Sequence, residues 1–373
     1  MSLAAEICAG LALLLAAWSY LVYPALIQHL ARSAAAPQAH GAVPAGVEVV
    51  LSAADEEDVI EARVGNLLEQ EAPAETRITV GCDGCRDRTA ELARSALGGR
   101  GRVVEFEARR GKAAVLNDLI EQSSAEVIVF TDANTRFDPG AVRELLRPFA
   151  DPRVGAVCGR LVLESAGGQD SETVFWDRET RLKQAEGRLG VCLGANGAIY
   201  AARRAAIEPL PGGTILDDFL VPARIARKGM RVEFAADAVA REEAGRDAAV
   251  EMARRFRIGT GAAAVLTGEG WLLRAGRHGL LSLAFFSRKL ARWTAPVFAL
   301  AAAVAALADA RLRPFGAAVL ALSAALVLLA AARVRLPGLA GRLYHFGVVN
   351  VALAAGVVAG LLGYRRPAWR RTR

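Results

Sequence analysis

Residues 127–134 read VIVFTDAN, a short apolar run rich in β-branched and aromatic side chains that ends in polar residues. Such runs are typical of buried strands. Three more occur earlier in the chain: Val47–Leu51, Arg77–Cys82 and Val103–Phe106. A helical pattern follows each of the four, over Val59–Glu69, Thr89–Ala96, Ala113–Gln122 and Ala141–Phe149. This alternation predicts an α/β fold in which helices cover a parallel sheet.

Polar residues fall at the carboxyl ends of these predicted strands, where ligands bind in parallel α/β sheets. They are Asp55-Glu56-Glu57, Asp83-Gly84, Arg109-Arg110-Gly111-Lys112 and Thr131-Asp132-Ala133-Asn134. One acidic pair after a strand is commonly a helix cap, but four successive charged strand ends favour a nucleotide site. Carboxylates would receive the base, the ribose and a metal, and Lys112 would place positive charge near the phosphates.

The sequence lacks the motifs that mark several other enzyme classes. Neither G-x-x-x-x-G-K-[ST] nor G-x-G-x-x-G occurs, which disfavours P-loop and Rossmann proteins. The chain shows no Ser-His-Asp order and no metal-binding His pair, which disfavours a hydrolase. Five cysteines form no secreted-type framework, so we expect reduced thiols. Cys82 and Cys85 make a C-x-x-C without a second pair, and we expect no zinc site there.

Composition indicates a membrane protein. The chain has 373 residues, of which 53% are hydrophobic, and a net charge of +7. Charge gathers in the middle and apolar runs lie at the ends. The positive charge suits an anionic membrane surface or a phosphorylated substrate. Because no basic stripe with interleaved aromatic residues is present, we expect no nucleic-acid partner.

Four apolar runs predict membrane spans. Ile7–Ile27 carries no charged side chain and has tyrosine and tryptophan residues toward its far end. A signal peptide is the alternative for this run, but Glu6 stands where a basic segment would be expected. Three more runs, close to spanning length, are Trp293–Leu307, Phe315–Ala332 and Tyr344–Leu362.

The segment before the last three runs, Trp271–Arg292, mixes leucine and phenylalanine with arginine and lysine. This pattern predicts an amphipathic helix at the membrane interface. The domains expected are a first span in 1–30, an α/β domain in 45–245, an Arg-rich motif with interface helices in 246–292, three spans in 293–363 and a basic tail in 364–373. If the α/β domain is cytoplasmic, three spans after it put the basic tail outside, against the positive-inside tendency.

Taken together, these segments resemble family 2 glycosyltransferases with a GT-A fold, especially the membrane-embedded branch of cellulose, hyaluronan and poly-N-acetylglucosamine synthases. The first-strand signature appears as Ser52–Glu57 (SAADEE), with Ala54 where the family often has an aromatic residue. The second appears as Asp83–Thr89 (DGCRDRT), and the metal motif as Asp132-Ala133-Asn134. The resemblance implies a mixed, mainly parallel sheet, with transmembrane helices at both ends of the chain.

The resemblance also implies roles for these residues. The nucleotide would contact Ala53, Glu56, Asp83, Lys112 and Asp132. Asp132 and Asn134 would face Mg²⁺ or Mn²⁺, for which an amide is a weaker ligand than a carboxylate. The donor would be a nucleotide-sugar, with a UDP-sugar favoured.

Three later segments match further family motifs. Gly194-Ala195-Asn196-Gly197 resembles the acceptor-side motif, so Gly194, Asn196 and Gly197 would lie beside the acceptor, although a plain turn explains this stretch equally well. Leu216-Asp217-Asp218 matches the motif whose last Asp is the general base. Asp218 would therefore take the acceptor proton with Asp217 in support, or both would cap the next helix. Residues 254–258 (RRFRI) stand where the synthases have QxxRW, with Ile258 in place of the tryptophan.

Arg254, Arg255 and Arg257 would bind the departing diphosphate, or else anionic lipid. The sequence thus predicts an inverting glycosyltransferase in the plasma (inner) membrane, with several spans and a cytoplasmic catalytic domain. A saccharide or a lipid-linked molecule would be the acceptor, with polysaccharide synthesis favoured. Single-sugar transfer to a polyprenyl phosphate or glycolipid is the alternative. A catalytically inactive nucleotide-binding membrane scaffold is an alternative of another class.

Overall fold

The computed structural model describes residues 2–34, 41–164, 171–243, 248–334, 336 and 338–364. The chain forms two compact units. One contains Ile27–Ala244, and the other combines Met1–Leu26 with Gly245–Arg366.

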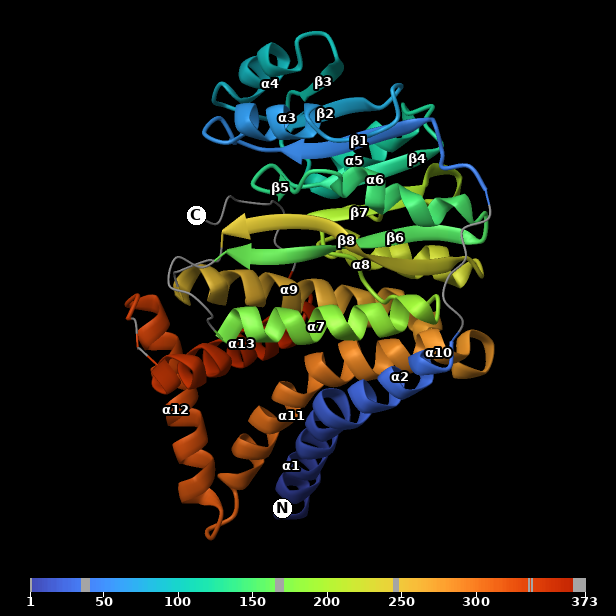
Figure 1. The fold of residues 1–373 in the computed structure, drawn as a ribbon. Helices are drawn as coiled ribbons and strands as arrows, with labels where there is room; N and C mark the ends of the chain where they lie inside the picture. Colours follow the sequence, from blue (N-terminus) through green and yellow to red (C-terminus); the bar gives the residue numbers. More distant parts are fainter. Residues whose placement is uncertain are drawn as a thin grey trace. The chain divides into compact units, whose positions relative to one another are not determined.

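An eight-stranded sheet runs through the first unit in the order β3-β2-β1-β4-β7-β6-β8-β5 (Figure 1). Its strands are β1 (Val47–Ala53), β2 (Arg77–Asp83), β3 (Gly101–Phe106), β4 (Val127–Thr131), β5 (Arg136–Phe137), β6 (Val154–Glu164), β7 (Ile199–Arg203) and β8 (Arg231–Glu243). β1 pairs in parallel with β2 and β4, β2 with β3, and β6 with β8. β7 runs antiparallel to β4 and β6, and β5 runs antiparallel to β8. The predicted mixed, mainly parallel sheet is confirmed.

Helices connect these strands. They are α3 (Ile60–Leu68), α4 (Thr89–Leu97), α5 (Lys112–Glu121), α6 (Ala141–Leu146), α7 (Ser171–Arg188) and α8 (Asp217–Arg227), with the short turns η2 (Arg147–Ala150) and η3 (Arg204–Ala206). α2 (Tyr23–Arg32) precedes the first strand. The first four predicted strands and the helices that follow them all form, with ends shifted by a few residues at most.

Both faces of the sheet are buried because the central strands are apolar on each side. In β4, Val127 and Val129 join one core cluster, which also contains Ile60 of α3. Ile128 and Phe130 point the other way and join a second cluster with Leu116 of α5. Side chains alternate along a strand, so an uninterrupted apolar run covers both faces. The carboxyl ends of the strands are left for the polar loops.

The other unit is helical. Its elements are α1 (Ser2–Ala17), the π-helical turn η1 (Trp18–Val22), α9 (Ala248–Gly268), η4 (Gly270–Leu273), α10 (Ala275–Phe285), the π-helical turn η5 (Phe286–Leu290), α11 (Ala291–Ala306), α12 (Arg313–Ala331) and α13 (Gly338–Leu361). Four stretches are long and apolar enough to cross a membrane: Leu3–Arg32, His278–Ala306, Arg313–Ala331 and Gly338–Leu361. Each overlaps one of the four predicted apolar runs. The second stretch crosses residue 292 without a break, so the segment expected to lie at the interface continues directly into this candidate span.

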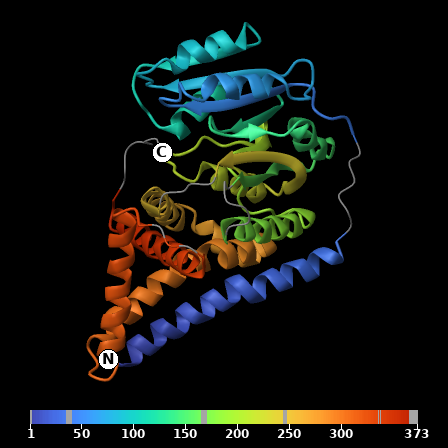
Figure 2. The same ribbon diagram turned by 60° about the vertical axis from the view of Figure 1, so that its left-hand side comes forward.

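Two helix pairs organise this unit (Figures 1 and 2). α1 lies beside α11, and Trp18 Nε1 donates a hydrogen bond to Ser287 Oγ at 2.8 Å. α9 lies beside α13, where glycines bring the two backbones together. A Cβ on Gly259 of α9 would meet Leu353 O of α13 at 2.5 Å. Small residues allow such close contact between helices in a membrane.

Candidate active site

The loop after β4 lies at the centre of the sheet and carries Asp132 and Asn134. Thr131 ends the strand, and its hydroxyl donates a hydrogen bond to Ala198 O at 2.8 Å, next to the 194–197 loop. Arg63 of α3 donates to the same hydroxyl at 2.5 Å. On the far side of the loop, Asn66 of α3 accepts from Phe137 N at 2.8 Å. The loop is therefore held at both ends by α3.

Lys112 brings together carboxylates from two elements. As the first residue of α5, it places Nζ 2.8 Å from Asp132 Oδ1 and 3.4 Å from Asp217 Oδ2. Burial alone would lower the pKa of Lys112, but the charges of Asp132 and Asp217 outweigh burial and raise it. The ammonium is therefore fully protonated at neutral pH.

Asp217 and Asp218 begin α8 and differ in their surroundings. Asp217 is buried, and its Oδ2 accepts no hydrogen bond among the described residues. Burial raises the pKa of Asp217 to about 6, against the lowering effect of Lys112, and the charge of Asp218 adds to the rise. Asp218 is partly exposed. Leu216, at the N-cap position of this helix, makes no side-chain capping hydrogen bond.

The 194–197 loop faces these carboxylates through Gly197. A Cβ on Gly197 would lie 3.3 Å from Asp132 Oδ2, 3.6 Å from Lys112 Nζ and 3.8 Å from Asp218 Oδ2. Asp218 O accepts a hydrogen bond from Ala195 N at 2.8 Å, which ties this loop to α8. Asn196 points inward instead: it accepts from Lys183 Nζ at 2.6 Å and donates to Gly159 O at 3.0 Å. Gly194 supplies a left-handed backbone, with φ of 80°.

The predicted nucleotide residues Ala53, Glu56 and Asp83 lie at the ends of β1 and β2. Asp83 is buried, and its two carboxylate oxygens accept from Arg110 N at 2.6 Å and Gly111 N at 2.8 Å. Asp83 thus fixes the backbone immediately before Lys112. Ala53 and Glu56 are also buried.

Asp55 adds a charged contact to this end of the site. It has a left-handed backbone, with φ of 59°, and its carboxylate accepts from Arg109 at 2.7 Å and from Arg86 N at 2.8 Å. Burial opposes ionisation of Asp55, but these hydrogen bonds and the charge of Arg109 hold its pKa below the usual value. An ionised Asp55 therefore joins the loop after β3 to the turn after β2.

The donor set at Asp132 fits Mg²⁺ or Mn²⁺. Asp132, Asp217 and Asp218 offer hard carboxylate oxygens, and the buried Asp217 Oδ2 has no hydrogen-bond donor among the described residues. Asn134 is exposed at the end of the same loop. A second group, Asp55, Cys85 and Asp87, has ligand atoms within 4.8 Å of one another. There the carboxylate of Asp87 already binds Thr89 N at 3.0 Å and Glu57 N at 3.1 Å, as in an ordinary turn.

Arg254, Arg255 and Arg257 lie on α9, in the helical unit. Arg255 Nε donates to Glu251 Oε1 at 2.5 Å, and Arg254 lies 3.5 Å from Glu251 Oε2. Glu251 is buried and keeps a pKa below its usual value, because the two arginines outweigh the effect of burial. Within this unit Arg254 and Arg255 therefore form an ionic cluster with Glu251.

Sequence reasoning missed three buried polar residues next to the strand-end site. They are Arg63, which holds Thr131; Lys183, which holds Asn196; and Tyr200 of β7, whose ring stacks on Phe130 with centroids 4.4 Å apart. Burial raises the pKa of the Tyr200 phenol, and the charges of Asp217, Asp218 and Asp132 add to the rise. Only Arg63 had a signal in the sequence, because its spacing from Ile60 and Leu67 puts it on the apolar face of α3.

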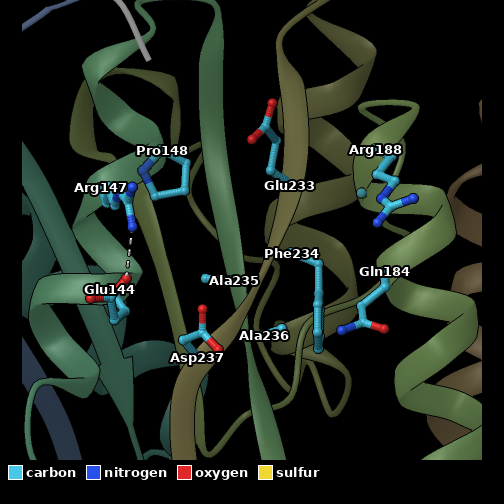
Figure 3. A pocket seen from close by; sticks show the side chains of 11 residues that line it. Glu144, Arg147, Pro148, Gln184, Arg188, Glu233, Phe234, Ala235, Ala236 and Asp237 are labelled. Carbon is cyan, nitrogen blue, oxygen red and sulfur yellow. Dashed lines mark ion pairs between the residues drawn. The ribbon is translucent and has the colours of Figure 1, made fainter. Parts of the chain in front are cut away.

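A separate cavity of about 340 Å³ lies between α7, η2 and β8 (Figure 3). Its lining includes Arg147, Gln184, Arg188, Phe234 and Asp237. None of the residues predicted from the sequence to be functional lines this cavity.

Known proteins resemble this chain in both sequence and fold. Residues 48–207 match the model of the glycosyl transferase family 2. Succinoglycan biosynthesis protein ExoU of Rhizobium meliloti is 38% identical over 107 residues, which cover 28% of this chain and 31% of that protein. Poly-beta-1,6-N-acetyl-D-glucosamine synthase of Staphylococcus epidermidis is 32% identical over 116 residues, covering 31% and 28%. The chain therefore matches about a third or less of the length of these relatives.

A solved structure shares the fold over nearly the whole chain. Mannosyltransferase PcManGT from Pyrobaculum calidifontis, in complex with GDP-Man and Mn²⁺, superposes with a TM-score of 0.67 at 23% identity. The match covers 95% of this chain and 99% of that one. The family match identifies residues 48–207 as a glycosyl transferase family 2 domain, and the shared fold shows that this domain has the GT-A architecture.

Proposed function

We propose that the protein transfers a sugar, with inversion at C1, from a nucleoside diphosphate to a hydroxyl of a saccharide or lipid-linked acceptor at a membrane. The observation that carries this proposal is the meeting of Asp132, Lys112, Asp217 and Asp218 beside Gly197 at the ends of the strands. Charges of both signs there suit a diphosphate with a divalent metal on one side and a proton acceptor on the other.

In this proposal each residue has one task. Asp83 and Asp55 hold the loops around the nucleotide, and Lys112 binds the diphosphate. Asp132 and Asn134 hold Mg²⁺ or Mn²⁺, which neutralises the leaving diphosphate as the bond to C1 breaks. Gly197 has no side chain, so the acceptor sugar can approach the carboxylates closely.

Asp218 is the general base in this mechanism. It is partly exposed, whereas Asp217 is buried against Lys112. A carboxylate oxygen of Asp218 takes the proton of the acceptor hydroxyl while the hydroxyl oxygen attacks C1 from the face opposite the diphosphate. A single displacement of this kind inverts the configuration. Asp217 supports it by holding Lys112 in place.

Polysaccharide synthesis is the favoured setting, because the relatives are named for succinoglycan and poly-N-acetylglucosamine. The solved neighbour carries GDP-Man and Mn²⁺. A GDP-sugar is therefore a second candidate donor, besides the UDP-sugar that we expect from the family motifs. Ile258, at the position of the family tryptophan, favours the second candidate, a single transfer to a polyprenyl phosphate or glycolipid. We place the α/β unit in the cytoplasm and the apolar helices in the inner membrane.

The test is diphosphate release by detergent-purified protein, across a panel of UDP- and GDP-sugars with Mg²⁺ or Mn²⁺. Asp218→Asn should abolish release and still bind the donor, since it removes the base without removing a donor contact. Normal turnover in that variant would refute the assignment of the base. If no donor is turned over and Asp218→Asn leaves cellular function intact, the inactive scaffold is correct. Product length on a gel with radiolabelled donor separates polymer synthesis from single transfer.

A further inference from the structure

Lys112 occupies part of the site that a metal would need. Its Nζ lies 2.8 Å from Asp132 Oδ1, the carboxylate of the metal motif, and 3.4 Å from Asp217 Oδ2. The side chain is largely buried, so water screens these contacts only weakly. A divalent cation approaching Asp132 would meet a positive charge already bound to the same carboxylate.

The charges of the described residues make this competition severe. Asp132, Asp217 and Asp218 carry three negative charges at most, and Lys112 cancels one of them. The third position of the metal motif adds none, because Asn134 is neutral. The buried guanidinium of Arg63 adds another positive charge that interacts with Asp132. The free site is thus a weak one for a metal ion.

A diphosphate changes this balance. It brings several negative charges, and its oxygens are strong acceptors for an ammonium group. The backbone of Lys112 cannot move far, because Gly111 N is bonded to Asp83 Oδ2 at 2.8 Å. The side chain has room, because Gly197 has no Cβ where one would lie 3.6 Å from Nζ. Lys112 can therefore leave Asp132 for a phosphate while α5 stays in place.

We propose that Lys112 is an internal counter-ion that keeps the metal out of the free enzyme, so that metal and nucleoside diphosphate bind as a coupled pair. This inference rests on the proposed function, since it takes a diphosphate donor for granted. By linkage, the factor by which the diphosphate tightens metal binding equals the factor by which the metal tightens diphosphate binding. Losing Lys112 should therefore strengthen binding of the metal alone.

The test is a titration of Mn²⁺, followed by electron paramagnetic resonance, on the detergent-purified full chain with and without UDP or GDP. The unmodified protein should bind Mn²⁺ at least about tenfold more tightly when the nucleotide is present. Lys112→Gln should bind Mn²⁺ alone about tenfold more tightly than the unmodified protein, with a smaller effect of nucleotide. Lys112→Arg keeps the charge and should still exclude the metal. Asp132→Asn should lose binding in both conditions, which identifies the site.

Arg110→Gln is the matched control, because it removes a cation two residues away that pairs with Asp118 at 2.6 Å. An equal gain in Arg110→Gln would mean a general charge effect and would overturn the inference. So would unchanged Mn²⁺ binding in a folded Lys112→Gln protein. The titration measures no turnover, so its result is separate from that of the activity assay. Coupling without sugar transfer would refute only the proposed function, and transfer without coupling would refute only the role of Lys112.

Discussion

The buried charge of Arg63 holds the loop after β4 in place. Arg63 is almost fully buried, contacts Thr131 and Asn66, and places its guanidinium 4.2 Å from the centre of the Phe137 ring. Burial lowers the pKa of Arg63 to about 9, while Asp132 and Glu242 oppose the shift, so the side chain stays charged at neutral pH. It places a buried positive charge beside the partly exposed carboxylates of Asp132 and Glu242.

Arg63→Met should destabilise the protein by about 3 kcal/mol, because it leaves Asp132 and Glu242 without this buried counter-charge. The measurement is the shift in apparent Tm of the detergent-purified protein, followed by tryptophan fluorescence. Arg94→Met is the control, since Arg94 is exposed and pairs with Glu105 at the surface. Equal shifts in the two variants would contradict a special role for Arg63.

The raised pKa of Asp217 predicts how stability depends on pH. The ordinary value is 3.8 and the folded value is about 6, so between them the folded protein keeps a proton that the unfolded chain has lost. The free energy of unfolding therefore falls as pH rises through this window. Asp217→Asn should be more stable than the unmodified protein at pH 8, by on the order of 2 kcal/mol, and should lose this advantage near pH 4. Thermal unfolding of both proteins across pH measures the difference in stability between them. If that difference does not change with pH, Asp217 is not the group that titrates.

At the scale of elements, the sequence predicted the first half of the α/β unit more fully than the second. Val47–Leu51 and Val127–Phe130 are unbroken apolar runs, and runs of this kind mark strands buried on both faces. β8 is harder to recognise, since Ala235, Ala236 and Ala238 have no strong preference for a strand and its pairing with β6 shifts register there. Lys183 and Asn196 lie 13 residues apart, and only the folded chain brings them into contact.

Packing between elements gives a prediction for the helical unit. Gly259→Ala should destabilise the α9 and α13 pair by about 2 kcal/mol, because its Cβ would overlap Leu353 O. Gly268→Ala is a matched change in the same helix, and nothing lies within 4 Å of the added Cβ. We expect no loss there. Detergent-purified variants compared by apparent Tm give the measurement, and equal values would show that the close contact is unimportant.

For the whole molecule, the apolar runs predicted the four candidate spans, because a spanning helix needs a length and composition that few other segments have. The end of the expected interface segment could not be predicted, since the change from a mixed to an apolar helix near Arg292 has no break in its backbone. Sequence could place the strand-end motifs in order, but it could not show that Lys112 forms an ion pair with Asp132.

Four crossings would leave the two ends of the chain on the same side, opposite the α/β unit. Protease-cleavable tags at both ends should therefore be cut on intact spheroplasts, while a tag at residues 244–247 should be protected until the membrane is opened. Protection of only the carboxyl-terminal tag would mean an odd number of crossings and would satisfy the positive-inside tendency of the Arg-rich tail.

The contact between α9 and α13 also has a consequence for biosynthesis. α9 emerges from the ribosome directly after the α/β unit, whereas α13 is the last helix that the structure describes. The face of α9 around Gly259 therefore has no partner while two apolar helices, α11 and α12, are synthesised. The α/β unit can fold early, since domains generally fold in order of synthesis. The helical unit cannot close until translation has passed Leu361, so a chain that stops before α13 should be recognised as unfinished by quality-control proteases.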